Sequence, residues 1–464
     1  MAPEPLAYAL ARYSRSPDSI RDSLAWVRAH DSSKFLDSFY FQYGHASIAD
    51  LGHLALCFEG ISEIAAIEIE DEPLWDGQAR SSRYQDFSKA GLVTPPELTD
   101  GEAGVYRAAG ANLLAAYRGM HAKCVEALKS RLPRPGAMKP EAYERNIAAR
   151  AFDIARYLLI LGAPTGVGQV TSIRTLERQI RRMKASEYAE IRALGEETAA
   201  ACTRLPECLW REEEPAAPVA PTLAKYVSAD PYPGIARQEV AQWAAENLPP
   251  KRTEEAARVE LTRPEEPAAD IAATLLYSVT DRSYRELYSL AAGWSSAMRM
   301  EVLDAALKSR SRHDDLLREF RGGPYVYDFF LDIGAYRDLH RHRRCTQVRQ
   351  RFSWGNGFEL PQPAAEFSLA VEMSAALEAA RSAAAQLPSP ASHYLLPFAS
   401  RCRFLMKMDF AEAEYISRLR SGVKGHFSYR DAAWRMKTEM ERLEPDLGRL
   451  IEATPPEVED PLIR

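Results

Sequence analysis

Long apolar runs, paired cysteines and glycine-rich nucleotide motifs are all missing from this sequence. No apolar stretch in the 464 residues has the length needed to cross a bilayer, so we expect no membrane segment. The six cysteines include no C-x-x-C pair, which argues against a zinc cluster or a disulfide-rich secreted scaffold. The N-terminal residues 1–5 lack the basic and then apolar profile of a signal peptide. These absences together predict a cytoplasmic protein with no metal site.

An overall excess of positive charge is missing as well. The chain has 59 Lys and Arg against 65 Asp and Glu, for a net charge of -6. This balance argues against a protein that binds nucleic acid through its phosphate backbone. Hydrophobic residues make up 46% of the chain and charged residues 27%, as in ordinary globular proteins. The length allows two or three domains.

Positive charge is concentrated in residues 337–351, which hold six arginines. Asp338 is the only acid there, so the local surplus is six minus one, or five positive charges. Such a cluster repels itself unless an anion neutralises it, and planar guanidinium groups suit phosphate. The stretch predicts a pocket for a phosphate-bearing ligand, and the alternative is a solvated basic helix face. His340 and His342 bracket Arg341, but the arginines disfavour a metal cation, and the lack of aromatic residues around the cluster disfavours nucleic acid.

Helical patterns fill most of the remaining sequence. Apolar periodicity predicts helices over residues 51–58, 63–69, 104–132, 145–161, 174–203, 364–387 and 412–420. Proline and glutamate are frequent in residues 213–268, which predicts a linker between a module at 1–212 and a module at 269–464.

A weak internal repeat supports two copies of one module. Tyr277-Ser278 precedes Ser283-Tyr284-Arg285 at the same interval that separates Tyr13-Ser14 from Ser19-Ile20-Arg21. Each half then has an arginine-rich stretch, a long helix and a basic helix. This shared order predicts a tandem duplication.

Several motifs resemble those of the flavin-dependent thymidylate synthase (ThyX) family. The family signature is R-H-R followed seven residues later by serine, usually in S-x-R-Y. Arg341-His342-Arg343 resembles the first part, and Ser81-Ser82-Arg83-Tyr84 resembles the second part in the other half of the chain. Residues 153–159 resemble the E-x-A-R-x-x-L-P motif, and residues 182–192 resemble R-x-D-x-x-A-Q-x-E-I-R. Four further elements of the second half fall at matching places: Leu396-Pro397, Arg420, His426 and Arg430.

Neither half carries the whole signature. Asp71-Glu72-Pro73 occupies the R-H-R positions of the first half, and Arg351 occupies the signature serine position of the second half. Asp338 stands where the family has glutamine, and His393 stands where the first half has Arg156. Because the family site lies between subunits of a homotetramer, the resemblance implies that one half donates R-H-R and the other the phosphate loop. A homodimer of this duplicated chain would then imitate the tetrameric core.

The resemblance implies an α+β fold of two tandem ThyX-like modules, mainly helical, each with a small sheet. It implies reductive methylation of C5 of a uridylate, dUMP to dTMP, with FAD as cofactor and with methylenetetrahydrofolate and NADPH as co-substrates. The alternatives are a methylase of UMP or another pyrimidine nucleotide, and a flavin- or nucleotide-binding paralogue that has lost the reaction.

The resemblance also assigns roles to individual residues. Arg182 or Arg420 would stabilise charge on the pyrimidine ring, with Arg192 or Arg430 in support. The flavin-facing residues would be Arg337, Arg341, His342, Arg343 and His45, although His45 has a structural hydrogen-bonding role as its alternative. The nucleotide would be held by Ser81, Ser82, Arg83, Tyr84 and Arg156. Arg182 and Arg192 have surface salt bridges as their alternative.

Overall fold

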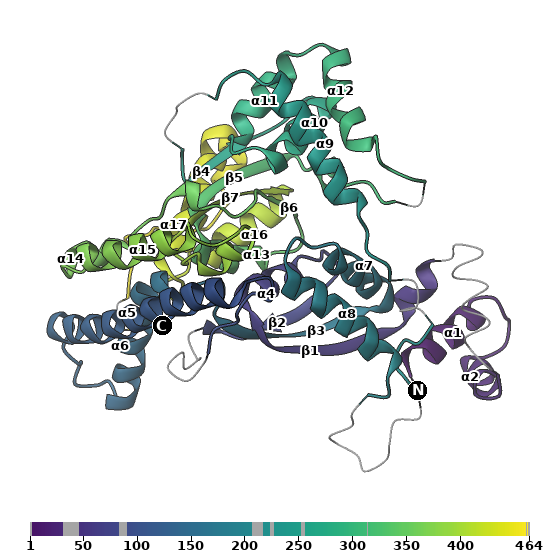
Figure 1. The fold of residues 1–464 in the computed structure, drawn as a ribbon, viewed down its shortest axis with the longest axis horizontal. Helices are drawn as coiled ribbons and strands as arrows, with labels where there is room; N and C mark the ends of the chain where they lie inside the picture. The colour runs from purple at the N-terminus through teal and green to yellow at the C-terminus, as the bar shows by residue number, and fades with distance from the viewer. Residues whose placement is uncertain are drawn as a thin grey trace. The chain divides into compact units, whose positions relative to one another are not determined.

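The computed structural model describes residues 2–30, 46–82, 91–206, 217–222, 227–251, 256–312, 314–460 and 462. These residues form many helices and two antiparallel sheets, of three and four strands (Figure 1). The predicted α+β fold, mainly helical with a small sheet in each half, is confirmed. In this part of the chain no helix is both long and apolar enough to span a membrane.

Contacts divide the chain into two compact units that interleave along the sequence. Unit 1 comprises Met1–Ser81, Pro95–Glu97 and Pro164–Pro231. Unit 2 comprises Ser82–Thr94, Leu98–Ala163 and Tyr232–Arg464. Part of the first sequence half therefore folds with the second half.

Unit 1 is built on the three-stranded sheet, in the order β1-β3-β2. Its strands are β1 (His53–Ser62), β2 (Asp76–Ala79) and β3 (Pro164–Ser172). The α-helices of this unit include α1 (Pro3–Tyr13), α2 (Ile20–Arg28), α4 (Glu63–Glu70), α7 (Ile173–Lys184) and α8 (Ala189–Thr203). The Ser62 and Ser172 hydroxyls accept hydrogen bonds from backbone N–H groups in the first turns of α4 and α7, so each strand passes directly into a capped helix.

The helix predicted over residues 51–58 is wrong. These residues end the 3-10 helix η2 (Ala46–Leu51) and begin β1. Leu54 and Phe58 are buried while His53, Ala55 and Cys57 are exposed, which is the two-residue alternation of a strand with one buried face. Short apolar runs of this length do not distinguish helix from strand.

Unit 2 is built on the four-stranded sheet, in the order β4-β5-β7-β6. Its strands are β4 (Val259–Thr262), β5 (Tyr325–Asp332), β6 (Thr346–Arg349) and β7 (Arg401–Met408). Asp332 caps α13 (Ile333–His340), and Asp409 caps α16 (Phe410–Arg420). The chain continues through α17 (Phe427–Leu443) and α18 (Pro445–Gly448).

Both halves of the sequence repeat one order of elements. A strand, a capping residue and a helix follow one another in β1–α4 and β3–α7, and again in β5–α13 and β7–α16. The short strand β2 has its counterpart in β6, and the Ser19 and Ser283 hydroxyls cap α2 and α11 (Tyr284–Gly293). The predicted tandem modules are therefore present in the fold.

Corresponding segments of the two halves pair within unit 2. The long helix α5 (Asp100–Arg131) packs on α15 (Ala370–Ala384), and α6 (Pro140–Ala155) leads into the 3-10 helix η4 (Arg156–Leu158). The backbone N–H groups of Leu161 and Phe398 donate to the Leu396 and Leu159 carbonyls, over 3.0 and 2.7 Å. The segment after η4 is thus held against its own counterpart.

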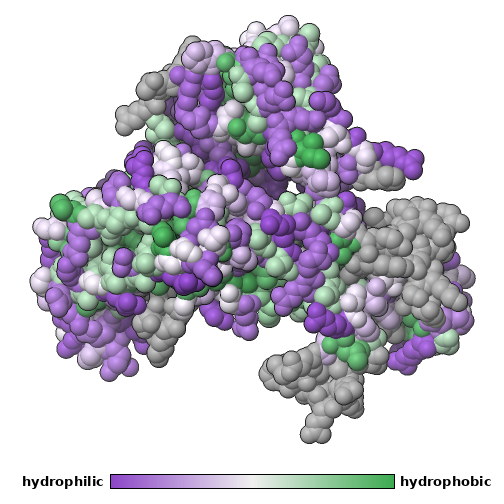
Figure 2. Space-filling model, viewed as in Figure 1, coloured by the Kyte–Doolittle hydropathy of each residue, from purple (hydrophilic) through white to green (hydrophobic). Residues whose placement is uncertain are grey.

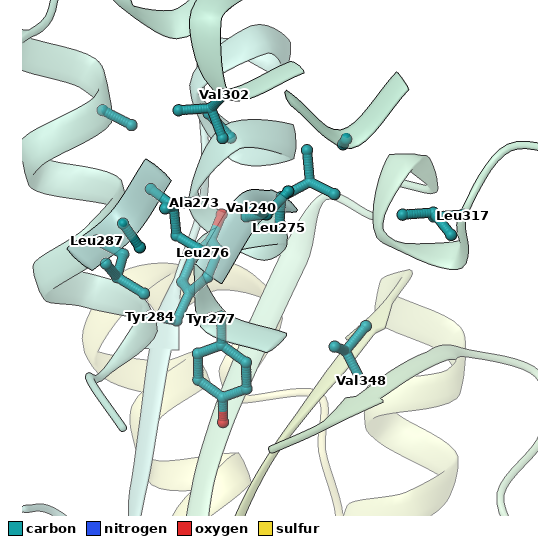
Figure 3. Packing of buried hydrophobic residues seen from close by; sticks show 14 of the residues in the cluster. Val240, Ala273, Leu275, Leu276, Tyr277, Tyr284, Leu287, Val302, Leu317 and Val348 are labelled. Carbon is teal, nitrogen blue, oxygen red and sulfur yellow. The ribbon is translucent and has the colours of Figure 1, made fainter. Parts of the chain in front are cut away.

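Four helices of unit 2 share one apolar core with its sheet: α9 (Tyr232–Asn247), α10 (Pro267–Val279), α11 and α12 (Ser296–Leu307). Figure 3 shows Leu276, Tyr277 and Val302 in this core, together with Val348 of β6. Hydrophilic residues cover most of these helices in the view of Figure 2, with small hydrophobic patches between them. The segment 213–268 contains α9 and β4, and the predicted module boundaries stay a prediction.

The remaining predicted helices are present in the fold, although two of them are each divided into two helices. Residues 63–69 form α4, 104–132 form α5, 145–161 form most of α6 with η4, and 412–420 lie in α16. Residues 174–203 form two helices, α7 and α8, and 364–387 form α14 (Gln362–Glu366) and α15.

Candidate active site

Four arginines surround the carboxylate of Asp338 in unit 2. Arg156 Nη1 donates a hydrogen bond to Asp338 Oδ2 over 3.1 Å. Burial alone would raise the pKa of Asp338, but Arg156, Arg341, Arg337 and Arg420 outweigh it and hold the pKa below its usual value. Asp338 is therefore ionised and faces four guanidinium groups; Asp153 and Asp332 also act on Arg156, so the cluster carries four positive charges minus three, a surplus of one. A surplus of this kind favours an anionic ligand.

Arg156 owes its position to a glycine in α13. Its side chain is almost fully buried, and a Cβ on Gly334 would lie 3.3 Å from Arg156 Nη2 and 3.5 Å from Nε. The missing side chain at Gly334 thus makes room for the guanidinium beside the first turn of α13. Arg156 Nε and Nη2 have no hydrogen-bond partner in the described part of the chain. Asp338 therefore accepts from only one of the three guanidinium nitrogens of Arg156, Nη1.

The R-H-R motif follows directly on α13, and its three side chains differ in environment. Arg341 is exposed, Arg343 is half-buried, and His342 is buried. His342 Nε2 accepts a hydrogen bond from Arg420 Nε over 2.7 Å, and His342 Nδ1 lies 3.7 Å from Glu412 Oε1. Burial lowers the pKa of His342, assisted by Arg420 and opposed by Glu412. The imidazole is therefore neutral near pH 7.

Arg337 lies on the buried side of α13. Its guanidinium is 4.8 Å from the centre of the Phe398 ring, a distance that allows a cation–π contact. It is one of the four arginines that act on Asp338, so α13 contributes both an arginine and the central carboxylate.

Arg430, predicted to support the reaction, is fully buried in α17. It donates to the carbonyl oxygens of Ser421 over 3.0 Å and Val458 over 2.8 Å. These bonds tie the C-terminal segment to the turn after α16. Its predicted role in the reaction stays a prediction.

Arg182 is surrounded by carboxylates of unit 1. It lies 3.2 Å from Glu72, 3.6 Å from Glu68 and 3.7 Å from Asp71, and it donates to the Glu68 carbonyl over 2.8 Å. Asp71 and Glu72 are the residues that stand at the R-H-R positions of the first half. The first half therefore places acids where the second half places arginine and histidine.

The last of the predicted catalytic arginines, Arg192, is exposed and donates to the Ser186 and Glu187 carbonyls over 2.8 and 3.0 Å.

In the second half, His393 stands at the position that Arg156 holds in the first half. Burial lowers the pKa of His393 to about 4, with a further effect from Arg351 and Arg349, so this position carries no charge near pH 7.

The predicted phosphate loop is described only at its start. Ser81 is half-buried after β2, and Ser82 is buried. Arg83, Tyr84 and His45 lie outside the described residues. That this loop and Arg341-His342-Arg343 form one binding site stays a prediction.

Sequence reasoning missed Glu412. Its signal was its place on a helix: it lies eight positions before Arg420, so the two side chains are about 80° apart around α16 and share one broad face. The sequence also gave no sign that Asp338 would pair with Arg156, because 182 positions separate them.

Buried thiols take no charge in this fold. Burial raises the pKa of Cys124 and Cys345 to about 12 and that of Cys202 to about 11, so these three remain protonated near pH 7. Over the described ranges, no group of three or more His, Cys, Asp or Glu residues is placed to hold a metal ion.

Comparison with known proteins gives matches along most of the chain. The family model for thymidylate synthase complementing protein (Thy1) matches residues 1–206 and 251–446. A UPF0159 protein of Chlamydia muridarum (strain MoPn / Nigg) is 24% identical over 445 residues, 90% of this chain and 82% of the relative. The UPF0159 protein Ta1429 of Thermoplasma acidophilum is 32% identical over 147 residues, 31% of this chain and 30% of that protein.

A solved structure of flavin-dependent thymidylate synthase ThyX from Helicobacter pylori, complexed with FAD and dUMP, covers 43% of this chain and 89% of its own, with 15% identity and a TM-score of 0.26. The family model matches both halves of the sequence, as the tandem repeat of elements requires. The chain is a member of the thymidylate synthase complementing protein (Thy1) family, with two ThyX-like modules in tandem.

Proposed function

We propose that this protein catalyses the FAD-dependent reductive methylation of C5 of a uridylate, with dUMP as substrate and methylenetetrahydrofolate as the methylene donor. The observation that carries the proposal is the cluster around Asp338, in which Arg156 of one module joins Arg337, Arg341 and Arg420 of the other. Membership of the Thy1 family supports the assignment of the reaction.

The four guanidinium groups around Asp338 fit both proposed ligands, because FAD and dUMP are phosphate esters. Arg341 is exposed and can meet an incoming anion, and it would face the flavin together with His342, Arg343 and Arg337. FAD, when bound and reduced, would supply the hydride that completes the methyl group, and NADPH would be the reductant of the flavin. Arg156 would contribute charge toward the nucleotide phosphate, together with the loop that begins at Ser81.

Arg420 is the arginine that we assign to the pyrimidine ring. C5 of uracil becomes nucleophilic when negative charge builds on the ring, and a fixed guanidinium stabilises that charge. Arg420 is half-buried, and His342 orients its Nε. Arg182 is the alternative, but three carboxylates of unit 1 already neutralise it.

A paralogue without the reaction is the second candidate. The observation in its favour is that carboxylates of unit 1 neutralise Arg182, one of the two ring-facing candidates, and backbone carbonyls hold Arg430, one of the two supporting candidates. Methylation of UMP or another pyrimidine nucleotide is the other variant of the proposal. The proposed homodimer would bring two copies of the cluster together.

The proposal is tested by release of tritium from nucleotide labelled at C5. Purified protein is reconstituted with FAD and supplied with methylenetetrahydrofolate, NADPH and either 5-tritiated dUMP or UMP. We expect FAD to remain bound through gel filtration and tritium to be released from dUMP. Bound FAD without release from either nucleotide would identify the paralogue and exclude the methylase.

A further inference from the structure

Glu412 is a buried carboxylate beside the R-H-R motif. It lies in the first turn of α16, is 7% exposed, and its Oε1 is 3.7 Å from His342 Nδ1. A buried carboxylate is costly unless a donor or a positive charge lies near it. A proton on His342 Nδ1 meets that need.

The opposite side of the same imidazole is fixed by Arg420. His342 Nε2 accepts from Arg420 Nε over 2.7 Å, and an accepting nitrogen carries no proton. Since the imidazole is neutral near pH 7, its single proton lies on Nδ1, toward Glu412. The His342 ring therefore connects Glu412, in the first turn of α16, with Arg420, the last residue of α16.

The backbone beneath the ring is held separately. Cys345 Sγ and Gln347 Nε2 both donate to the His342 carbonyl, over 3.1 and 2.5 Å. The Tyr415 ring meets His342 nearly edge-on, with centroids 5.9 Å apart. These contacts limit the position of the ring but do not select which nitrogen carries the proton. The two charged groups of α16 make that selection.

We propose that Glu412 is a positioning residue: its carboxylate selects the His342 tautomer with hydrogen on Nδ1, and Nε2 then holds Arg420 beside Asp338. The role in the reaction rests on the proposed function, because the orientation of Arg420 matters to turnover only if Arg420 acts on the substrate. The tautomer itself does not depend on that function.

The first test is nitrogen-15 NMR of the full chain labelled at histidine, with the His342 signals assigned by their loss in His342→Gln. Of the nine histidines in the chain, His342 should show a protonated Nδ1 and an unprotonated Nε2 at pH 7.5. Glu412→Gln should reduce the excess of the Nδ1–H form by about fivefold or more. A protonated Nε2 in the wild-type protein would overturn the proposal, with or without enzymatic activity.

The second test is turnover. Glu412→Gln should lower kcat about tenfold or more with little change in KM, and Glu412→Asp should restore part of the loss. The matched control is Glu414→Gln, two residues away on α16, whose carboxylate pairs with exposed Arg418 over 2.8 Å. Equal kcat in Glu412→Gln and Glu414→Gln would contradict a positioning role. Absence of activity in the wild type would count against the proposed function, and the NMR result would still decide the tautomer.

Discussion

Arg156 and Asp338 stand 182 positions apart in the sequence, yet Arg156 Nη1 donates to Asp338 Oδ2 over 3.1 Å. Arg156 comes from the first module and Asp338 from the second. Arg156 fills a position that His393 fills in the second half, and Asp338 stands where the related family has glutamine. The pair joins the two modules within one compact unit.

The first prediction concerns this pair. Asp338→Asn should lower the free energy of unfolding by about 1–3 kcal/mol, because Arg156 is buried and would lose its charged partner, while the partial exposure of Asp338 moderates the loss. Urea unfolding at pH 7 measures it. The matched control, Glu439→Gln, breaks the more exposed pair with Arg442 and should change stability by less than about 0.5 kcal/mol. Equal losses in the two variants would show that the Arg156–Asp338 pair contributes no more than a surface pair.

The second prediction concerns Gly334. A methyl group there would lie 3.0 Å from Asp332 Oδ1 and 3.3 Å from Arg156 Nη2, which is tighter than ordinary van der Waals contact. Gly334→Ala should therefore destabilise the protein by about 1–3 kcal/mol, although alanine favours a helix. Gly104→Ala in α5 is the control, since a Cβ there meets nothing within 4 Å, and it should stabilise by about 0.5–1 kcal/mol. Thermal unfolding of both variants measures the change in stability. A Gly334→Ala variant more stable than the wild type would contradict the close packing of Arg156 against Gly334.

The sequence supported the modules and most helices, because apolar periodicity and capping residues are local signals. It did not reveal β1, whose short apolar run also suits a helix, nor the apolar core of α9–α12, which begins in a segment rich in proline and glutamate. Arg430 illustrates the limit for the site. Its carbonyl partner Val458 lies 28 positions away in the C-terminal segment, and no residue type signals a backbone acceptor.

The third prediction is a pH effect at Asp332, which caps α13 and accepts a hydrogen bond from Ser428. Burial and nearby Glu359 raise the pKa of Asp332 to about 6. Because an unfolded aspartate has a pKa of about 3.9, the folded protein binds this proton more tightly. Its stabilising contribution is complete below about pH 4 and is lost as the pH rises through 6, a change of about 3 kcal/mol.

Asp332→Asn removes this titration while keeping a side chain that can cap the helix. The difference in unfolding free energy between wild type and Asp332→Asn should therefore shift in favour of the variant between pH 4 and pH 7. Asp409→Asn, the equivalent cap of α16, is the control for loss of a cap carboxylate. A difference that is constant over this pH range would contradict a raised pKa at Asp332.

The fourth prediction separates the two ring-facing arginines. Arg420→Ala should lower turnover about 100-fold or more, because it removes a fixed donor at the site of developing charge. Arg182→Ala should change turnover by less than about threefold, since Glu68, Asp71 and Glu72 neutralise Arg182 within unit 1. Assays well below the unfolding temperature of each variant separate loss of chemistry from loss of fold. The reverse order of the two effects would assign the reaction to the first module.

The central claim is that arginines of both modules act on one bound anion. Calorimetric titration of dUMP into the FAD-bound protein tests it most directly, with Arg156→Met from the first module and Arg420→Met from the second. Each variant should raise the Kd about tenfold, the effect of losing one charge-assisted hydrogen bond of about 1.4 kcal/mol. If Arg420→Met weakens binding while Arg156→Met leaves the Kd within about twofold of wild type, the two modules do not share a site and the account is wrong.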